Sequence, residues 1–326
     1  SGTVDWSTGT NWAGSTAPVS SATTALVFTG SMSASEVFLS NNNTSGTFTL
    51  NYLQFTGSAG NNTPMLTISG NPLSFSGASP RISVSSGTTP GGTGRPQWTI
   101  SNNIVINSAA LSLQNPNASN SAFLTGTISG TGGLNRDSGT GGVKISGTAN
   151  TFSGPVSIAA NGSLDAVTFG TAAGSASSLG TSGTITLGSS SNAGTLNWVG
   201  SGTETTSKVF VMAGTTGAAT ITNNSAGNLL AITSDLSITG SGNKTLTFGG
   251  SGNLSFSGLI GAGPGSSVIS FTKSGTGTVT LSGTANAFTG SVGINGGTLA
   301  AASLGAAAGS VSSLGTSGTI SLGSGT

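Results

Sequence analysis

The chain of 326 residues contains no cysteine and no histidine. Without cysteine it can form neither disulfides nor thiolate metal sites, and without histidine it lacks the commonest metal ligand and the usual base at neutral pH. A Ser-His-Asp triad is therefore excluded. The sequence also lacks an Asp-x-Asp calcium motif, and we expect no bound metal and no cofactor.

Charge is almost as scarce. Only 4% of the residues are charged, against roughly 25% in an ordinary soluble domain, and the formal net charge is +1. Because the basic residues do not cluster, we expect no nucleic-acid partner. No apolar run approaches the ~20 residues that a helix needs to span a bilayer, so we expect no membrane insertion by this chain.

The chain is rich in glycine, threonine and regularly spaced large apolar residues. Glycine supplies 56 residues and phenylalanine 13, and hydrophobic residues make up 34%. Threonine alternates with a large apolar residue in four short stretches, 47–50, 184–187, 245–248 and 278–281. Such alternation gives a strand one apolar and one hydroxylated face, and turn residues follow each stretch. The pattern predicts an all-β protein.

The chain also repeats itself at long range. Two phrases each occur twice, in residues 145–164 and 281–299 and in residues 172–188 and 307–323. Leu179 and Leu314 occupy equivalent places 135 residues apart. Because this period is too long for one structural unit, it indicates a super-repeat made of several shorter units.

Two architectures could absorb such strands: a β-sandwich array, or a coil in which each strand stacks on its counterpart one turn later. The long spacing between matching phrases and the Gly- and Asn-rich corners favour the coil, with ~22 residues per turn. We expect a capping or docking segment at residues 1–30 and a β-solenoid at residues 31–326, in which the second super-repeat copy is incomplete at the C-terminus.

The repeated phrases share a motif of one basic residue, spaced glycines, an asparagine and an aromatic residue. In the second copy (residues 273–299) its positions are Lys273, Gly275, Gly277, Leu281, Gly283, Asn286, Phe288 and Gly290, and in the first copy (residues 136–164) they include Arg136, Gly147, Asn150, Phe152 and Gly154. The first copy also carries an extra residue and has Asp137 after the basic position. The motif resembles the passenger-associated β-strand repeat of bacterial autotransporters. This resemblance implies a right-handed parallel β-helix (β-solenoid) that is extracellular, on the bacterial cell surface.

Acidic residues are the first place to look for chemistry, because a β-helix enzyme acting on polysaccharide would need carboxylates on neighbouring coils. The chain has six of them, Asp5, Glu36, Asp137, Asp165, Glu204 and Asp235. Only Asp137 and Asp165 are about one coil apart, and Arg136 and Lys144 lie near Asp137. This group could be a sugar site or a solvated ion cluster at a turn. We expect the ion cluster, no catalytic residue and no enzyme.

The tryptophans allow two interpretations. Trp6 and Trp12 could stack on a carbohydrate or dock another molecule, or they could cover the core at the first turn of the solenoid, which we favour. For Trp98, Trp198 and Tyr52 we expect core or corner positions.

Outward threonines raise a further alternative, since flat threonine ladders can organise water and bind ice. Ice binding needs long, unbroken ranks, and Ser, Lys and Gly interrupt the pattern here. Keeping an exposed β-face soluble without charge is the simpler role for these threonines.

These observations together predict a non-catalytic extracellular fibre protein with a structural or adhesive role. The alternative is a carbohydrate-active β-helix enzyme or a glycan-binding module, and ice binding is a minor alternative. The partners we expect are surface glycans and the chain itself, because Ile320 and Leu322 on the final predicted strand have no visible cover and would allow head-to-tail filaments.

Overall fold

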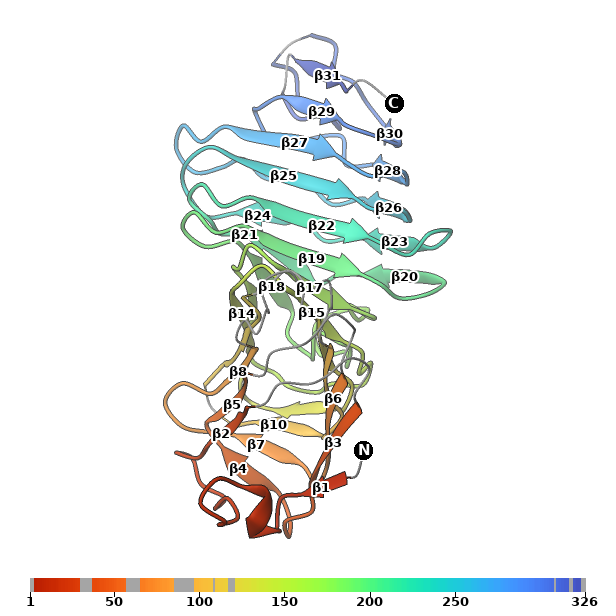
Figure 1. Ribbon diagram of the computed structural model, residues 1–326. Helices are drawn as coiled ribbons and strands as arrows, with labels where there is room; N and C mark the ends of the chain where they lie inside the picture. Colours follow the sequence, from red (N-terminus) through yellow and green to blue (C-terminus); the bar gives the residue numbers. More distant parts are fainter. Residues whose placement is uncertain are drawn as a thin grey trace. The chain divides into compact units, whose positions relative to one another are not determined.

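The computed structural model describes residues 3–29, 37–56, 65–84, 97–107, 109–116, 121–307, 309–316 and 319–323 (Figure 1). Regular structure in these ranges consists of β-strands and one 3-10 turn, Gly9–Asn11. The chain divides into two compact units: unit 1 is Ser1–Pro155 with Ala176–Thr181, and unit 2 is Val156–Ser175 with Ser182–Thr326. Within the described part of the chain, no helix has the length and apolar character needed to cross a membrane.

Unit 1 is built from three parallel sheets that the chain visits in turn. The first contains β1 (Thr3–Asp5), β3 (Val37–Asn42), β6 (Met65–Gly70), β9 (Gln97–Ile100), β12 (Ser121–Leu124) and β15 (Gly142–Ile145). The second contains β2 (Ala25–Phe28), β5 (Tyr52–Phe55), β8 (Arg81–Val84), β11 (Leu111–Gln114) and β14 (Leu134–Ser138). The third contains β4 (Phe48–Leu50), β7 (Leu73–Phe75), β10 (Ile104–Ile106) and β13 (Ile128–Gly130).

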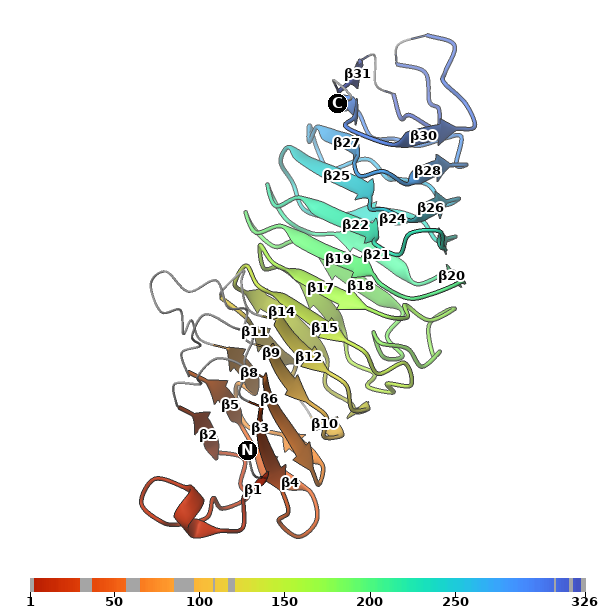
Figure 2. The same cartoon turned by 45° about the vertical axis from the view of Figure 1, so that its right-hand side comes forward.

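The strands of unit 2 likewise lie in three parallel sheets (Figure 2). One contains β17 (Ser163–Ala166), β19 (Gly194–Trp198), β22 (Ala219–Asn223), β25 (Lys244–Gly249), β27 (Ile269–Lys273), β29 (Val292–Ile294) and β31 (Ile320–Leu322). The next contains β16 (Val156–Ile158), β18 (Thr184–Leu187), β21 (Val209–Met212) and β24 (Leu236–Ile238). The last contains β20 (Thr203–Thr206), β23 (Leu229–Ile232), β26 (Asn253–Phe256), β28 (Thr278–Leu281) and β30 (Thr298–Ala301).

Each strand pairs in parallel with its counterpart one turn later, so both units are β-solenoids and the predicted all-β parallel β-helix is confirmed. The right-handed sense of the coil stays a prediction. The expected ~22 residues per turn is wrong for most turns. Lys144 pairs with Phe123, 21 residues earlier, but Leu39 pairs with Thr3, 36 residues earlier, because loops of different length connect the strands.

The core consists of inward columns of apolar side chains. Leu196, Ile221 and Phe248 stand in register on β19, β22 and β25, and all three are fully buried. The residues beside them, such as Thr195 and Thr220, are half-buried and lie on the other face. The predicted alternation of apolar and hydroxylated faces is therefore confirmed.

The N-terminal segment supplies strands as well as a cover for the core. β1 pairs with β3 and β2 pairs with β5, so residues 3–29 belong to the sheets of unit 1. Residue 30, the predicted boundary, lies outside the described residues. Trp6 is fully buried; its indole N–H donates to Ser40 Oγ at 2.7 Å, and its ring lies 5.2 Å from that of Phe48 and 6.0 Å from that of Trp12. This packing agrees with the interpretation that Trp6 covers the core, and docking by Trp12, which is half-buried, stays a prediction.

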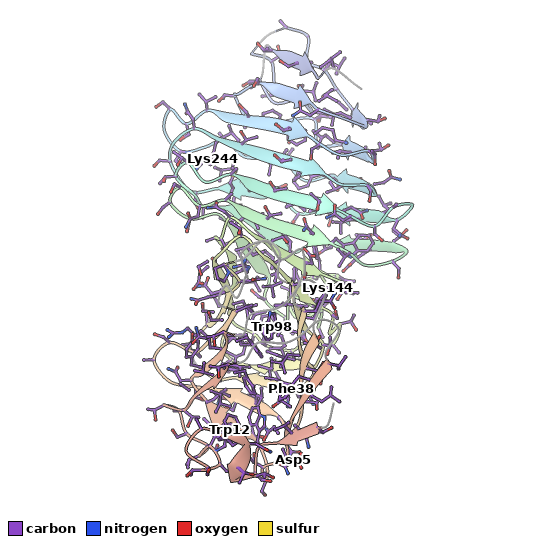
Figure 3. All side chains as sticks on the ribbon, in the orientation of Figure 1. Asp5, Trp12, Phe38, Trp98, Lys144 and Lys244 are labelled. Atoms are coloured by element: carbon purple, nitrogen blue, oxygen red, sulfur yellow. The ribbon has the colours of Figure 1, made fainter. Side chains whose placement is uncertain are left out.

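Core or corner positions were also predicted for three other aromatic residues, Trp98, Trp198 and Tyr52. Trp98 and Trp198 are buried, as predicted, and Trp98 lies between the sheets of unit 1 (Figure 3). Tyr52 is not a core residue: it is half-buried at the start of β5, next to the corner that follows β4, and alternates with the buried Leu53 and Phe55. Its ring is on the outer face, where the Arg81 guanidinium carbon lies 4.0 Å from the ring centre.

Candidate functional site

The two repeat copies place their asparagines in the same buried position. Asn150 is fully buried, and its Oδ1 accepts a hydrogen bond from the Ile128 N–H at 2.8 Å. Its Nδ2 donates to the carbonyls of Gly147 at 3.1 Å and Ser178 at 3.2 Å. One side chain thus joins the backbones of the preceding, the same and the following turn of the coil.

In the second copy, Asn286 repeats this arrangement. Its Oδ1 accepts from the Ile260 N–H at 2.8 Å, and its Nδ2 donates to the carbonyls of Gly283 at 3.3 Å and Ser313 at 2.7 Å. A buried amide that binds three backbone groups in this way stabilises the corner of the coil, because it joins the backbones of successive turns.

Phe152 and Phe288 also occupy equivalent inward positions, with 0% and 1% of their surface exposed, as the repeat predicts. The backbone of the following turn passes close to each ring at Gly180 and Gly315, which both have φ of +67°. A Cβ there would lie 2.4 Å from the Phe152 carbonyl oxygen or 2.3 Å from that of Phe288, so glycine is required at both places.

Most motif glycines are required for the same reason, because a side chain there would clash with the preceding turn of the coil. An added Cβ would lie within 2.8 Å of a heavy atom of the preceding turn at Gly147, Gly154, Gly275, Gly277, Gly283 and Gly290. Leu281, the remaining apolar position of the motif, is fully buried. The repeat motif is therefore used for stacking one turn on another.

The basic position of each copy is buried and bound to backbone carbonyls. The Lys273 ammonium donates to the carbonyls of Ser274 at 2.7 Å, Gly275 at 2.7 Å and Gly296 at 2.9 Å, and the Lys273 side chain is 0% exposed. Burial lowers the pKa of Lys273. The cation is held by carbonyl dipoles of two successive turns in place of water.

Arg136 does the same in the first copy. Its guanidinium donates to the carbonyls of Leu113 at 3.2 Å, Gly139 at 3.1 Å and Gly141 at 2.6 Å, and to that of Ser138. Burial lowers the pKa of Arg136 to about 10. The predicted solvated ion cluster is wrong for this residue, because Arg136 is only 1% exposed and lies inside the coil.

Two further lysines of unit 2 are also buried and donate to backbone carbonyls. The Lys208 ammonium donates to the Ser182 carbonyl at 2.5 Å, and the Lys244 ammonium (Figure 3) donates to the carbonyls of Gly214, Gly240 and Ser241. Burial lowers the pKa of both lysines, and the Glu204 carboxylate opposes this for Lys208. Four of the six cations that the structure describes are thus part of the interior.

The described carboxylates accept hydrogen bonds from neutral donors. Glu204 Oε1 accepts from the N–H groups of Phe169 at 2.7 Å and Gly170 at 2.8 Å, and Oε2 accepts from the Trp198 indole. Asp165 accepts from Asn197 at 2.7 Å. Asp5 and Asp235 likewise accept from Asn41 Nδ2 and the Leu259 N–H, and Glu36 lies outside the described residues.

Asp137 is different, because it lies beside a surface cavity of unit 1 together with other polar side chains. The cavity has a volume of about 250 Å³. Its walls are Ala78, Ser79, Pro80, Arg81, Ala109, Ala110, Ser112, Gln114, Asn135 and Asp137. Arg81, Ser112 and Asn135 stand in one row across β8, β11 and β14. We call this cavity the unit 1 groove.

A β-bulge brings Asp137 into the unit 1 groove. The register between β11 and β14 shifts between Ser112 and Gln114, so that β14 has one residue more than β11 over this interval. Arg136 points inward and Asp137 is half-buried on the outer face. Its carboxylate accepts from the Ser112 hydroxyl at 2.8 and 2.9 Å and from Gln114 Nε2 at 3.4 Å. Bulges commonly re-aim a side chain in this way.

Unit 2 has an uncharged outer rank of threonines on the sheet that contains β19, β22, β25 and β27. Thr195, Thr220, Thr247 and Thr272 pair in register on β19, β22, β25 and β27. The next position of the rank is Gly293 on β29. The rank ends there, so it is shorter than an ice-binding face would need, and ice binding stays a prediction.

The sequence did not identify Arg81, Gln114 or Asn135 as neighbours of Asp137. Arg81 and Gln114 belong to earlier coils, and coil lengths vary too much to align these residues with Asp137 from spacing alone, whereas Asn135 lies two residues before Asp137 on β14. The sequence did hold one signal for this cavity. Arg81 and Gln114 are long polar side chains that alternate with apolar residues on strands where the other polar residue is Ser. The residues proposed for docking, Ile320 and Leu322 on β31, are 50% and 77% exposed.

Comparison with known proteins agrees with the motif. Residues 137–166 and 271–301 match the family model described as the passenger-associated-transport-repeat. Searches of curated proteins and of solved structures found no match. Within the described ranges, no three acidic, cysteine or histidine side chains gather where they could hold a metal ion. The chain therefore carries two passenger-associated-transport-repeats within a β-solenoid, and this repeat family points to an autotransporter passenger domain that is secreted or exposed at the cell surface.

Proposed function

We propose that the chain is a non-catalytic, structural or adhesive passenger domain displayed on the outside of a bacterial cell. The observation that supports this most is the use of the repeat motif. Asn150, Asn286, Phe152 and Phe288 all act inside the coil, where they join and fill successive turns. A motif that serves stacking gives a protein length and rigidity and leaves its outer faces free for weak contacts.

The arrangement of the acids also supports a non-catalytic role. A glycoside hydrolase needs two carboxyl groups that flank one bond, with one of them held protonated by its surroundings. Asp165 and Glu204 accept hydrogen bonds from Asn197 and from two backbone N–H groups. Each of these carboxylates thus serves as a hydrogen-bond acceptor for groups of the coil itself.

Surface display is tested with antibodies against the chain on intact cells of the native bacterium. We expect immunogold label on unpermeabilised cells and loss of the label after brief protease treatment. Label that appears only after permeabilisation would contradict the proposal. Release of reducing ends from polysaccharides by the purified chain would contradict its non-catalytic part.

The proposal includes stacking with a second copy of this chain into head-to-tail filaments. The exposed apolar side chains of β31 and the scarcity of charge support it, because little repulsion would oppose contact between copies. Electron microscopy of the purified chain should show filaments that the double variant Ile320→Pro, Ser321→Lys shortens or abolishes. Monomeric wild-type particles at high concentration would contradict this part.

A further inference from the structure

The unit 1 groove gathers several kinds of hydrogen-bonding group in one cavity. Asp137 supplies a carboxylate, Arg81 a guanidinium, and Gln114 and Asn135 supply amides. Pro80 adds an apolar wall. The volume of about 250 Å³ is smaller than that of most drug-sized pockets, which start at roughly 300 Å³, and suits a ligand of one or two rings.

The groups in the groove retain hydrogen-bonding capacity for a ligand. A carboxylate offers about four acceptor positions, and Ser112 and Gln114 fill only part of those of Asp137. The Arg81 guanidinium carbon lies over the Tyr52 ring, 4.0 Å from its centre, and a guanidinium carries five N–H donors, so this contact with the ring leaves donors for a ligand. Acceptors and donors are thus both available at neighbouring positions of one cavity.

The two repeat copies differ at this place. Between the basic residue and the next inward strand residue, Arg136 to Val143 spans one residue more than Lys273 to Val279. Ser274 and Gly275 follow Lys273 directly, whereas Asp137 separates Arg136 from the corresponding Ser138 and Gly139. Both basic side chains bind the carbonyls of their Ser-Gly pair, so the interior is the same with and without the extra residue. Asp137 is therefore an addition to the outer face that stacking does not require.

From this geometry we propose that the unit 1 groove binds a neutral sugar ring of a surface or matrix polysaccharide. Vicinal hydroxyls of a pyranose would donate to the Asp137 carboxylate and accept from Arg81. The one cation and one carboxylate among the wall residues balance, which favours a neutral ligand over an acidic one. The inference rests on the proposed non-catalytic function and gives the adhesive role a defined ligand class.

Saturation-transfer-difference NMR on the full chain tests the proposal. The probes are glucose, galactose, mannose and N-acetylglucosamine, with glucuronic acid as an acidic comparison. We expect saturation transfer to at least one neutral sugar, and a loss of about tenfold or more in affinity in both Asp137→Asn and Arg81→Gln, since each leaves a buried hydrogen bond to the sugar unmade. Circular dichroism establishes that the variants are folded.

Asp165→Asn is the matched control, because it makes the same chemical change at another outward aspartate bonded to an amide. It should bind sugar as the wild type does. The proposal is overturned if no neutral sugar receives saturation, if only glucuronic acid does, or if Asp137→Asn binds like the wild type. Surface display does not depend on this result, and sugar cleavage during the NMR experiment would instead contradict the non-catalytic function.

Discussion

The first and second repeat copies bind their surroundings alike on the inside and differently on the outside. Asn150 and Asn286 each connect three successive coils. Arg136 and Lys273 each donate to backbone carbonyls in the tight turn directly after their own strand, at Gly139 and Gly275. The outer face of the first copy has the bulged Asp137, whereas the second copy continues without an extra residue.

This comparison separates two demands on the sequence. Stacking on the next turn constrains every inward position, because one wrong volume or one unpaired polar group affects both neighbouring turns. An outward position has only solvent and its two neighbours in the rank to satisfy. A bulge can therefore add a charged side chain to unit 1 while Thr220 and Thr247 continue a neutral rank in unit 2.

The largest expected effect comes from the shared aromatic position. We expect Phe152→Ala and Phe288→Ala each to lower the free energy of unfolding by about 3–5 kcal/mol, because each leaves a cavity in a packed core. The loss should be greater for Phe288 by about 0.5–1.5 kcal/mol, since its ring stacks on Phe271 with 5.9 Å between centres. Urea denaturation followed by circular dichroism measures both values.

Thr220→Ala, on the outer rank, is the control for this experiment and should change the free energy of unfolding by less than about 0.5 kcal/mol. A loss confined to one of the two phenylalanines would show that the copies are not equivalent inside.

The next effect concerns the buried amides. Asn150→Ala and Asn286→Ala each remove three hydrogen bonds and leave one N–H and two carbonyl groups without their partner. We expect each to lower the free energy of unfolding by about 2–3 kcal/mol. Hydrogen exchange should show the Ile128 or Ile260 amide losing its protection in the corresponding variant, and unchanged protection would refute the corner role.

Much of this interior was readable from the sequence. Alternating Thr and apolar residues predicted strands, and the Gly- and Asn-rich segments between them predicted the corners of a coil. The buried state of Arg136 was not predicted, because a cation beside Asp137 suggests a surface pair, and only the fold shows that backbone carbonyls surround it. The unit 1 groove was also missed, since Arg81 and Asp137 meet through the register of unequal coils.

A smaller effect would test the bulge itself. Deleting Asp137 gives the first copy the spacing of the second, with Ser138 directly after Arg136. We expect Arg136 to stay buried and the free energy of unfolding to change by less than about 1 kcal/mol, because the extra residue contributes to the outer face alone. Loss of folding in the deletion variant would show that the bulge is needed for the register of β14.

The smallest expected effect is a pH dependence of the free energy of unfolding, which differs between Lys273 and Arg136. Burial lowers the pKa of Lys273 below its usual 10.5 and lowers that of Arg136 to about 10. Between the folded and the unfolded pKa the unfolded chain binds more protons, so the free energy of unfolding rises with pH in that window. The window of Lys273 lies below pH 10.5, whereas that of Arg136 lies almost entirely above pH 10.

We therefore expect the urea midpoint to rise modestly from pH 8.5 to pH 10.5, with Lys208 and Lys244 contributing in the same direction because burial lowers their pKa too. The effect is small because carbonyl oxygens replace part of the lost hydration of each ammonium. In Lys273→Met the rise should be reduced, whereas in Arg136→Met it should be nearly unchanged over the same pH range. A midpoint that falls with pH in the wild type would mean that the carbonyls stabilise the cations more than burial destabilises them.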